Sequence, residues 1–311
     1  MRNIPLREAA INLQPSPSEI TVFAPAKINL ILRILDRRPD GFHNLWSIMQ
    51  TVALEDEVCI KLCADRPGIQ LRCDATQLAT NHSNLVYHAA AVVLARAQQS
   101  IGLDIELRKR IPMGAGLGGG SSDAAATIIG LNNLLRLEWS PKQMADVGQS
   151  LGSDVPFFLF APSACVAGRG ETVQPVVVEG ARWVVLVNPG FEVDTKWAYQ
   201  ELASTRTTVT PLSRAQRELD GQSKMSWAQL IAAAENDFEA PVFSAHGRLR
   251  EIKRSLQAYG AEIALLSGSG ATVFGVFSHE TLARRAQAQF VKDDFMKVFV
   301  VPICSGSLAW R

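Results

Sequence analysis

The feature that most constrains the fold is a glycine-rich segment that runs directly into a helical pattern. Residues 112–123 read PMGAGLGGGSSD, and after Ser121 apolar side chains recur at helical spacing, as at Ala124 and Ile128. Glycine lets successive backbone N–H groups turn toward one anion, and the helix start adds unpaired N–H groups and the positive end of its dipole. The segment predicts a phosphate-binding loop in which Ser121 and Ser122 donate to phosphate oxygens, with Ser122 as a candidate magnesium ligand.

Three other interpretations of this segment can be weighed from the sequence, and each is disfavoured. The P-loop of nucleotide triphosphatases requires a lysine where Gly120 stands. Gly114, Gly116 and Gly119 satisfy the dinucleotide pattern GxGxxG, but that fingerprint also requires a strand ending in an acidic residue about 20 positions on, whereas Glu138 lies between two helical stretches. A purely structural turn is disfavoured, because so many glycines lose backbone entropy without adding side-chain packing.

The composition is that of a folded, nearly neutral protein. Of 311 residues 47% are hydrophobic and 20% charged, and 31 basic against 30 acidic side chains leave a net charge of +1. This length allows one large domain or two of ordinary size, and the small net charge gives no reason to expect a nucleic acid or an anionic membrane as partner. No apolar run reaches the roughly 20 residues of a membrane span. We expect a soluble, cytoplasmic protein.

The cysteines form no recognisable metal or disulfide pattern. Cys59, Cys63, Cys73, Cys165 and Cys304 are odd in number and contain no CxxC pair. A zinc site built from the first three would lack an evident fourth ligand. We therefore expect reduced, buried thiols in a reducing compartment.

The order of periodic patterns indicates two domains after a leader. Residues 1–18 are polar and contain three prolines, which is typical of a flexible leader. We expect a strand-rich domain over residues 19–178 and, over 179–311, helices on one face of a mostly antiparallel sheet. The predicted strands are 20–23, 28–34, 52–62, 69–71, 101–107, 183–187, 263–266, 272–277 and 297–301. The predicted helices are 84–98 (capped by Asn84 or Ser83), one from Ser121, 142–151 (capped at Ser140), 228–235, 246–259 and 280–289.

Lys27 and Asn29 are polar residues within an otherwise apolar strand pattern. They are two positions apart, so their side chains point to the same face. A lysine on an edge strand whose ammonium reaches solvent is the ordinary alternative, but burying both groups without partners would cost several kcal/mol. Three short segments are ambiguous by themselves: DGFH at 40–43 is typical of a turn, GSDVP at 152–156 of a cap or turn, and LSGSGAT at 266–272 of a loop that lines a site or closes a hairpin.

Together these segments resemble the signature motifs of the GHMP superfamily, the small-molecule kinases that include galactokinase, homoserine kinase, mevalonate kinase and phosphomevalonate kinase. The order and spacing of PAKINL at 25–30, DGFH, the glycine run, GSDVP and residues 266–274 match the family of kinases that act on 4-diphosphocytidyl-2-C-methyl-D-erythritol. The resemblance extends from about Phe23 to Phe277. It implies a two-domain α+β fold, the first half similar to domain 2 of ribosomal protein S5 and the second ferredoxin-like, with substrate in the cleft between them.

The resemblance implies transfer of the ATP γ-phosphoryl group, with Mg²⁺, to the 2-hydroxyl of the methylerythritol part of a cytidine diphosphate conjugate, in the non-mevalonate isoprenoid route. It makes Asp154 the catalytic carboxylate and Lys27 its partner. An aspartate is a weak base for an alcohol, but in a loose phosphoryl transfer the proton leaves late, so a carboxylate that orients the hydroxyl suffices. Lys27 would hold Asp154 ionised and offset charge on the transferring group.

The resemblance also assigns binding residues. Asn29, Phe42 and His43 are implied at the substrate, where Tyr199 would hold the cytosine ring against Phe42. The family commonly has tyrosine at position 42, so this chain keeps the stacking face but lacks the hydroxyl. The residues implied at the nucleotide are Asn84, Lys109, Pro112, Met113, Gly114, Ala115, Gly116, Leu117, Gly118, Gly119, Gly120, Ser121 and Ser122.

Two other functions stay open to the sequence. A sibling kinase of the superfamily would keep the glycine loop but act on another alcohol without cytosine contacts. A nucleotide-dependent sensor would bind without transfer, which is disfavoured because Lys27, Asn29 and Asp154 are all present. In each case we expect a small-molecule partner, no nucleic acid and no membrane, and a monomer or weak homodimer.

Overall fold

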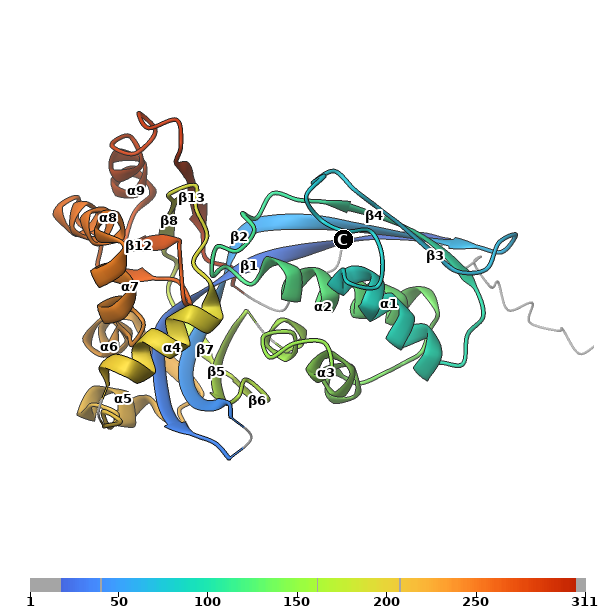
Figure 1. The fold of residues 1–311 in the computed structure, drawn as a ribbon, viewed down its shortest axis with the longest axis horizontal. Coiled ribbons are helices and arrows are strands. Elements are labelled where there is room, and N and C mark those ends of the chain that lie inside the picture. The colour runs from blue at the N-terminus through green and yellow to red at the C-terminus, as the bar shows by residue number, and fades with distance from the viewer. Residues whose placement is uncertain (1–17, 40, 161, 207, 306–311) are drawn as a thin grey trace, which may run out of the picture.

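The computed structural model describes residues 18–39, 41–160, 162–206 and 208–305. Residues 1–17 of the predicted leader and Asp40 of the predicted turn lie outside the described residues. Within these ranges the fold is α+β, as predicted, with a large mixed sheet and a smaller antiparallel sheet that lie side by side along the long axis of the molecule (Figure 1).

The large sheet is built mainly from the first half of the chain. Its order is β10-β1-β2-β4-β3, with β5 paired to β2 and β6 to β5, and its pairs are antiparallel except β3 with β4 and β1 with β10. This mostly antiparallel order excludes the dinucleotide-binding fold. The strands are β1 Glu19–Arg37, β2 His43–Cys63, β3 Ile69–Cys73, β4 Gly102–Arg108, β5 Ser163–Gly168, β6 Thr172–Pro175 and β10 Glu235–Asn236.

Strand β1 is continuous where the sequence predicts two strands interrupted by a proline. The pairing of β1 with β2 shifts register between Pro25 and Ala26. Such a bulge accommodates proline, which has no N–H for the ladder. The other predicted strand boundaries are close, except that β2 begins at His43 rather than at Val52, so that Gly41 and Phe42 of the predicted turn lie in the connection between β1 and β2.

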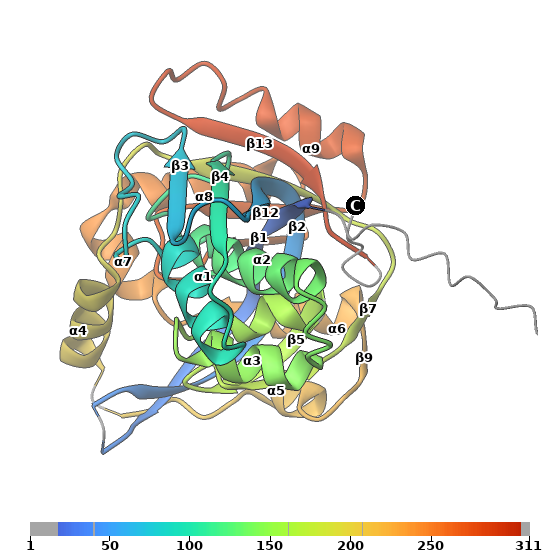
Figure 2. The ribbon, with the colours of Figure 1, turned by 90° about the vertical axis from the view of Figure 1, so that its right-hand side faces the viewer.

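Three helices cover one face of this sheet: α1 Leu85–Arg96, α2 Gly119–Leu134 and α3 Pro141–Gln149 (Figures 1 and 2). The predicted caps are confirmed, because Asn84 accepts the Val86 N–H and Ser140 forms a capping box with Gln143. Helix α2 packs on β1 and β2 on one side and on α1 and α3 on the other, so residues 122–131 are all buried. It begins at Gly119, two residues before the predicted start, which leaves the glycines before it as a loop between β4 and α2.

The smaller sheet has the order β11-β12-β8-β13 and is antiparallel throughout, as predicted. Its chain order β8, α8, β11, β12, α9, β13 is that of a ferredoxin-like unit, and α8 packs on β11 and β12 while α9 packs on β8 and β13. These elements are β8 Trp183–Asn188, α8 Gly247–Ala258, β11 Ile263–Leu266, β12 Val273–Phe277, α9 Glu280–Gln287 and β13 Lys297–Pro302.

Several short elements were not predicted from the sequence. They are the strands β5, β6 and β10 of the large sheet, a 3₁₀ turn at Pro156–Leu159, β7 Val177–Glu179, α4 Thr195–Thr205, α5 Arg214–Leu219, β9 Lys224–Ser226 and α7 Glu239–Ala245. The predicted helix 228–235 is α6 Trp227–Ala233, and its expected end is wrong, because Glu235 pairs with Ile31 as part of β10. A strand of the second half thus extends the sheet of the first.

A buried arginine joins the two halves at this strand. Arg33 of β1 is only 1% exposed, and its guanidinium contacts Glu235 Oε2 and Asp237 Oδ1, each at 3.0 Å. It also donates to Gln216 Oε1 at 2.6 Å. Because a buried cation without partners is strongly unfavourable, this position holds β10 and α5 against β1.

We predict that Arg33→Met lowers the free energy of unfolding by about 3 kcal/mol, because the Asp237 carboxylate, 9% exposed, loses one of its two arginine partners and the buried Gln216 amide oxygen loses a donor. Urea unfolding at neutral pH measures this change. Arg214→Met is the matched control, since Arg214 and Glu218 form an exposed pair on one helix, and it should change stability by less than about 0.5 kcal/mol. Equal effects of the two substitutions would contradict the role given to Arg33.

Candidate functional site

The glycine loop lies against a second glycine-containing loop from the smaller sheet. Gly116 has φ +73°, and a Cβ atom there would lie 2.0 Å from the Ser267 carbonyl oxygen, so only glycine fits. The Ser267 hydroxyl donates to the Gly116 carbonyl at 2.9 Å. The segment 266–272, which the sequence left open between lining a site and closing a hairpin, joins the hairpin strands β11 and β12 and packs on the glycine loop.

The loop forms one wall of a cavity of about 540 Å³ at the N-terminus of α2. Its lining includes the predicted nucleotide residues Asn84 and Lys109 and the whole loop from Pro112 to Ser121. Ser122 is the exception: it is buried and lies beside a separate small apolar pocket with Phe23 and Phe158, and its hydroxyl has no hydrogen-bond partner among the described residues. Ser121, rather than Ser122, lines the cavity.

Lys109 lies in the floor of this cavity between two buried carboxylates. Its ammonium contacts Asp123 Oδ2 at 2.6 Å and Asp56 Oδ2. Asp56 is held in turn by the backbone N–H groups of Arg110 and Ile111. Burial alone would lower the pKa of Lys109, but the two carboxylates outweigh it and raise that pKa. From the sequence, Asp123 was noted only as the last residue of the glycine segment, and Asp56 was given no role.

Asp123 has fewer hydrogen-bond partners than Asp56. It is 2% exposed, and its Oδ1 atom has no hydrogen-bond partner among the described residues. Burial raises the pKa of Asp123 to about 7, against the opposing effect of Lys109 and with a further rise from the charge of Asp56. Near neutral pH this carboxyl is therefore partly protonated, which reduces the negative charge beside an anion-binding loop.

Lys27 links the glycine loop to the predicted catalytic carboxylate. It is 4% exposed, its backbone N–H donates to the Leu117 carbonyl at 2.9 Å, and its ammonium lies 3.6 Å from Asp154 Oδ2. The ammonium also donates to Asn29 Oδ1 at 2.7 Å. The predicted same-face placement of Lys27 and Asn29 is confirmed, and the solvent-reaching lysine is excluded by its burial.

Asn29 does not reach the open site. It is 1% exposed, and both ends of its amide are engaged: Oδ1 accepts from Lys27 and from the Gly268 N–H, and Nδ2 donates to Ser47. In the structure the Asn29 amide oxygen supports the Lys27 ammonium, and the place of Asn29 at the substrate stays a prediction.

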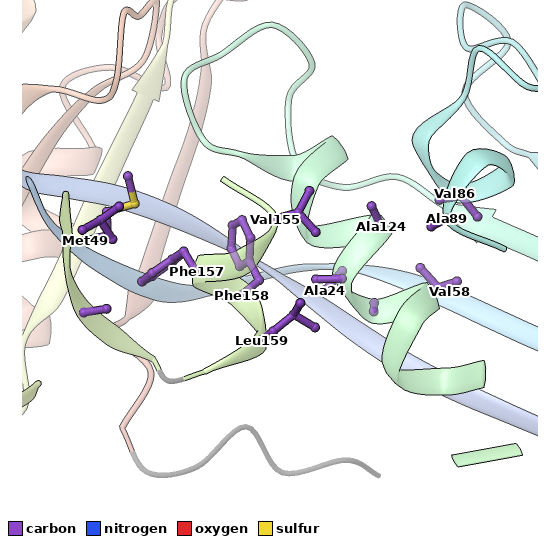
Figure 3. Close-up of a cluster of buried hydrophobic side chains, with 14 of the residues drawn as sticks. Ala24, Met49, Val58, Val86, Ala89, Ala124, Val155, Phe157, Phe158 and Leu159 are labelled. Atoms are coloured by element: carbon purple, nitrogen blue, oxygen red, sulfur yellow. The ribbon is translucent and has the colours of Figure 1, made fainter. Parts of the chain in front are cut away.

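Asp154 is carried on a short turn that is anchored by apolar side chains. Figure 3 shows Val155, Phe157, Phe158 and Leu159, directly after Asp154, packed among side chains of the strands and of α2. All four are buried, whereas the Asp154 side chain is 31% exposed. The turn therefore fixes its backbone in the core and presents the carboxylate toward Lys27.

The predicted aromatic substrate residues lie on the β1–β2 hairpin and on α4, and their role in holding cytosine stays a prediction. Tyr199 stacks on His43, with ring centroids 5.3 Å apart and an interplanar angle of 21°, and not on Phe42. The Phe42 ring, which is 52% exposed, is covered by the Arg169 guanidinium at 3.9 Å from the ring centroid. Burial, followed by the charge of Asp154, raises the pKa of Tyr199 to about 12.

His43 is held in its neutral form. Burial lowers its pKa below the ordinary 6.5, and the positive charges of Arg37 and Arg206 lower it further, against the opposing charge of Asp36. A neutral imidazole has one donor and one acceptor nitrogen, so it can exchange hydrogen bonds with the polar edge of a base.

The described part of the chain shows no other candidate centre of the kinds considered from sequence. No group of three or more His, Cys, Asp and Glu side chains in it is arranged to hold a metal ion. The five cysteines are free thiols, and only Cys165 is fully buried. No helix in these ranges combines the length and apolar character needed to cross a bilayer.

Comparison with known proteins identifies the family. Residues 84–161 match the family described as GHMP kinases N terminal domain, and residues 217–295 match GHMP kinases C terminal. The 4-diphosphocytidyl-2-C-methyl-D-erythritol kinase of Syntrophus aciditrophicus (strain SB) is 41% identical over 282 residues, which are 91% of this chain and 98% of that protein. The chain belongs to the 4-diphosphocytidyl-2-C-methyl-D-erythritol kinase family. The kinase of that name from Geobacter sp. (strain M21) is 40% identical over 88% of this chain and 95% of its own length.

Solved structures agree with membership of this kinase family. A crystal structure of 4-(cytidine 5'-diphospho)-2C-methyl-D-erythritol kinase superposes with a TM-score of 0.75 and 30% identity over 92% of this chain and all of the other. A homoserine kinase from Cytophaga hutchinsonii superposes with a TM-score of 0.73 at 20% identity, over 94% of this chain and 99% of the other. The second likeness concerns the fold alone.

The raised pKa of Asp123 predicts a pH dependence of stability. Because the folded state holds this proton up to about pH 7 and the unfolded state loses it near pH 4, folding stability falls as the pH rises between these values. We expect Asp123→Asn to remove this dependence, so that the variant gains about 2 kcal/mol relative to the parent between pH 5 and pH 7. Urea unfolding at pH 5, 6, 7 and 8 measures it.

Asp146→Asn serves as the control, since Asp146 is exposed on α3. It should leave the pH profile unchanged. Parallel profiles for the parent and Asp123→Asn would show that Asp123 is ionised throughout this range and would contradict the prediction.

Proposed function

We propose that this chain transfers the γ-phosphoryl group of ATP to the 2-hydroxyl of 4-diphosphocytidyl-2-C-methyl-D-erythritol. The observation that carries the proposal is the Lys27–Asp154 pair, whose lysine is bonded through its backbone to the glycine loop. An ammonium and a carboxylate beside a phosphate-binding loop suit transfer to an alcohol. The substrate is the one that names the relatives at 40% and 41% identity.

In the proposed reaction Asp154 accepts a hydrogen bond from the 2-hydroxyl and orients its oxygen toward the γ-phosphorus. The new O–P bond forms as the bond from the γ-phosphorus to the bridging oxygen of ADP breaks, and the hydroxyl proton passes to Asp154. Lys27 stabilises the negative charge on the transferring oxygens. Asn29 acts as a positioning residue, because its amide oxygen fixes the Lys27 ammonium.

The glycine loop and the N-terminus of α2 suit the triphosphate, since both offer backbone N–H groups to an anion. We propose that Asn84 and Lys109 lie near the adenosine, as the lining of the cavity allows. Mg²⁺ commonly keeps several waters and binds substrate phosphates with few protein ligands. This coordination fits a cavity whose lining includes Ser121. When bound, Mg²⁺ would neutralise phosphate charge.

We propose that Phe42, His43 and Tyr199 bind the cytidine end of the substrate. The neutral His43 suits the polar edge of cytosine, and the rings of Phe42 and Tyr199 offer stacking faces. We further propose that residues 19–178 form the ATP-binding domain and residues 179–311 the C-terminal domain. Strand β10 is then a contribution of the second domain to the sheet of the first.

The substrate assignment predicts which alcohol is phosphorylated. With ATP and Mg²⁺, the purified protein should release ADP when 4-diphosphocytidyl-2-C-methyl-D-erythritol is added, and CDP should compete with that substrate. Mevalonate and homoserine should give at most background release. A higher kcat/KM for either of these two alcohols would place the chain with another GHMP activity, and nucleotide binding without ADP release from any of them would exclude a kinase.

The catalytic pair predicts a loss of turnover without loss of the fold. We expect Asp154→Asn and Lys27→Met to lower kcat by at least about a hundredfold, because one removes the proton acceptor and the other the positive charge. Steady-state ADP release gives kcat, and thermal unfolding reports the fold. Lys61→Met, at an exposed position of β2, should leave kcat unchanged. If Asp154→Asn turned over at the parent rate, the role given to Asp154 would be wrong.

A further inference from the structure

The turn between β5 and β6 contacts Phe42, at the proposed cytosine site, and Ser153, next to Asp154. This turn, residues 168–171, carries Arg169, whose guanidinium lies over the Phe42 ring at 3.9 Å from its centroid. The position of the turn matters because Phe42, directly before β2, belongs to the proposed base-binding group, whereas the turn follows the neighbouring strand β5.

The turn is fastened to the β1–β2 hairpin by charge. The Glu171 carboxylate pairs with Arg38 of the hairpin loop at 3.5 Å, and it also accepts the backbone N–H of Arg169. Arg169 therefore approaches Phe42 from a backbone that is already bonded to the same hairpin. The contact between Arg169 and Phe42 is therefore supported by bonds of the neighbouring backbone and does not depend on the Arg169 side chain alone.

The same turn packs directly on the backbone beside Asp154. Gly170 has φ +118°, and a Cβ atom there would lie 2.5 Å from the Ser153 carbonyl oxygen. Only glycine permits this approach, because any side chain would enter the Ser153 carbonyl. The turn thus supports the proposed base site through Arg169 and borders the loop of the proposed proton acceptor through Gly170.

We propose that Arg169 is a positioning residue that determines recognition of the cytosine base. A planar guanidinium over one face of an aromatic ring attracts it electrostatically and fixes the plane of the ring. Phenylalanine at position 42 has no hydroxyl with which to anchor itself, so Arg169 supplies the anchor and presents the ring for stacking with the base. The inference rests on the proposed function, since it deepens the assignment of Phe42 to the cytidine end.

Substitution of Arg169 should affect binding of the cytidine substrate selectively. We expect Arg169→Ala to raise the KM for 4-diphosphocytidyl-2-C-methyl-D-erythritol by about tenfold, as suits the loss of one partly shielded cation–π contact. The kcat should stay within about twofold and the KM for ATP should not change, because Arg169 lies over the Phe42 ring and does not line the cavity at the glycine loop. Arg169→Lys keeps the charge but not the planar face, so it should restore part of the affinity.

Calorimetric titration with CDP provides a readout that is independent of turnover. The Kd of CDP should rise by the same factor in Arg169→Ala as the KM of the full substrate. Arg182→Ala is the matched control, because Arg182 makes a comparable contact with the Trp227 ring at 5.1 Å in another part of the molecule. It should leave the CDP affinity and both KM values unchanged.

Three results would overturn the inference. An unchanged CDP affinity in Arg169→Ala would show that Phe42 needs no support. A tighter CDP affinity would show that Arg169 occupies the place of the base and must be displaced. An equal loss of kcat, ATP affinity and melting temperature would show a general structural role. If the parent protein binds CDP but does not phosphorylate the proposed substrate, the proposed function fails, while the CDP titrations still decide the role of Arg169.

Discussion

The buried ammonium of Lys27 is the constraint on which the site depends. A cation at this depth needs partners, and it finds them in Asn29 and Asp154, while the same residue bonds the glycine loop through its backbone. Asn29 in turn accepts the Gly268 N–H. Through these contacts Lys27 of β1 connects the glycine loop, the turn that carries Asp154 and the loop at 266–272.

The second sheet completes the site. Asn236 of β10 donates to the carbonyls of Leu266 and Gly268, and the Ser267 hydroxyl holds Gly116. Arg33 fastens the same region to β1 through Glu235 and Asp237. The glycine loop is therefore shaped by contacts from both halves of the chain, and its conformation depends on their packing against each other.

The charged side chains at the cavity largely compensate one another. Lys109 is neutralised by Asp56 and Asp123, so the triphosphate would meet backbone N–H groups and a helix dipole rather than a row of exposed cations. The proposed triphosphate site is therefore compatible with a chain whose net charge is only +1.

The sequence by itself determined the local features: the glycine loop before a buried helix, the caps at Asn84 and Ser140, and the shared face of Lys27 and Asn29. These follow from backbone geometry and hydrogen bonds that span only a few residues. Resemblance to a family was needed to associate Asp154 with Lys27, because no local rule relates residues so far apart.

Only the tertiary structure decided that Asp56 and Asp123 clamp Lys109, that Ser122 is buried while Ser121 faces the cavity, that Tyr199 stacks on His43 and that Arg169 covers Phe42. Each of these contacts joins elements distant in the chain. Their partners are selected by how the two sheets and the helices pack, and that packing is a property of the whole fold rather than of any segment.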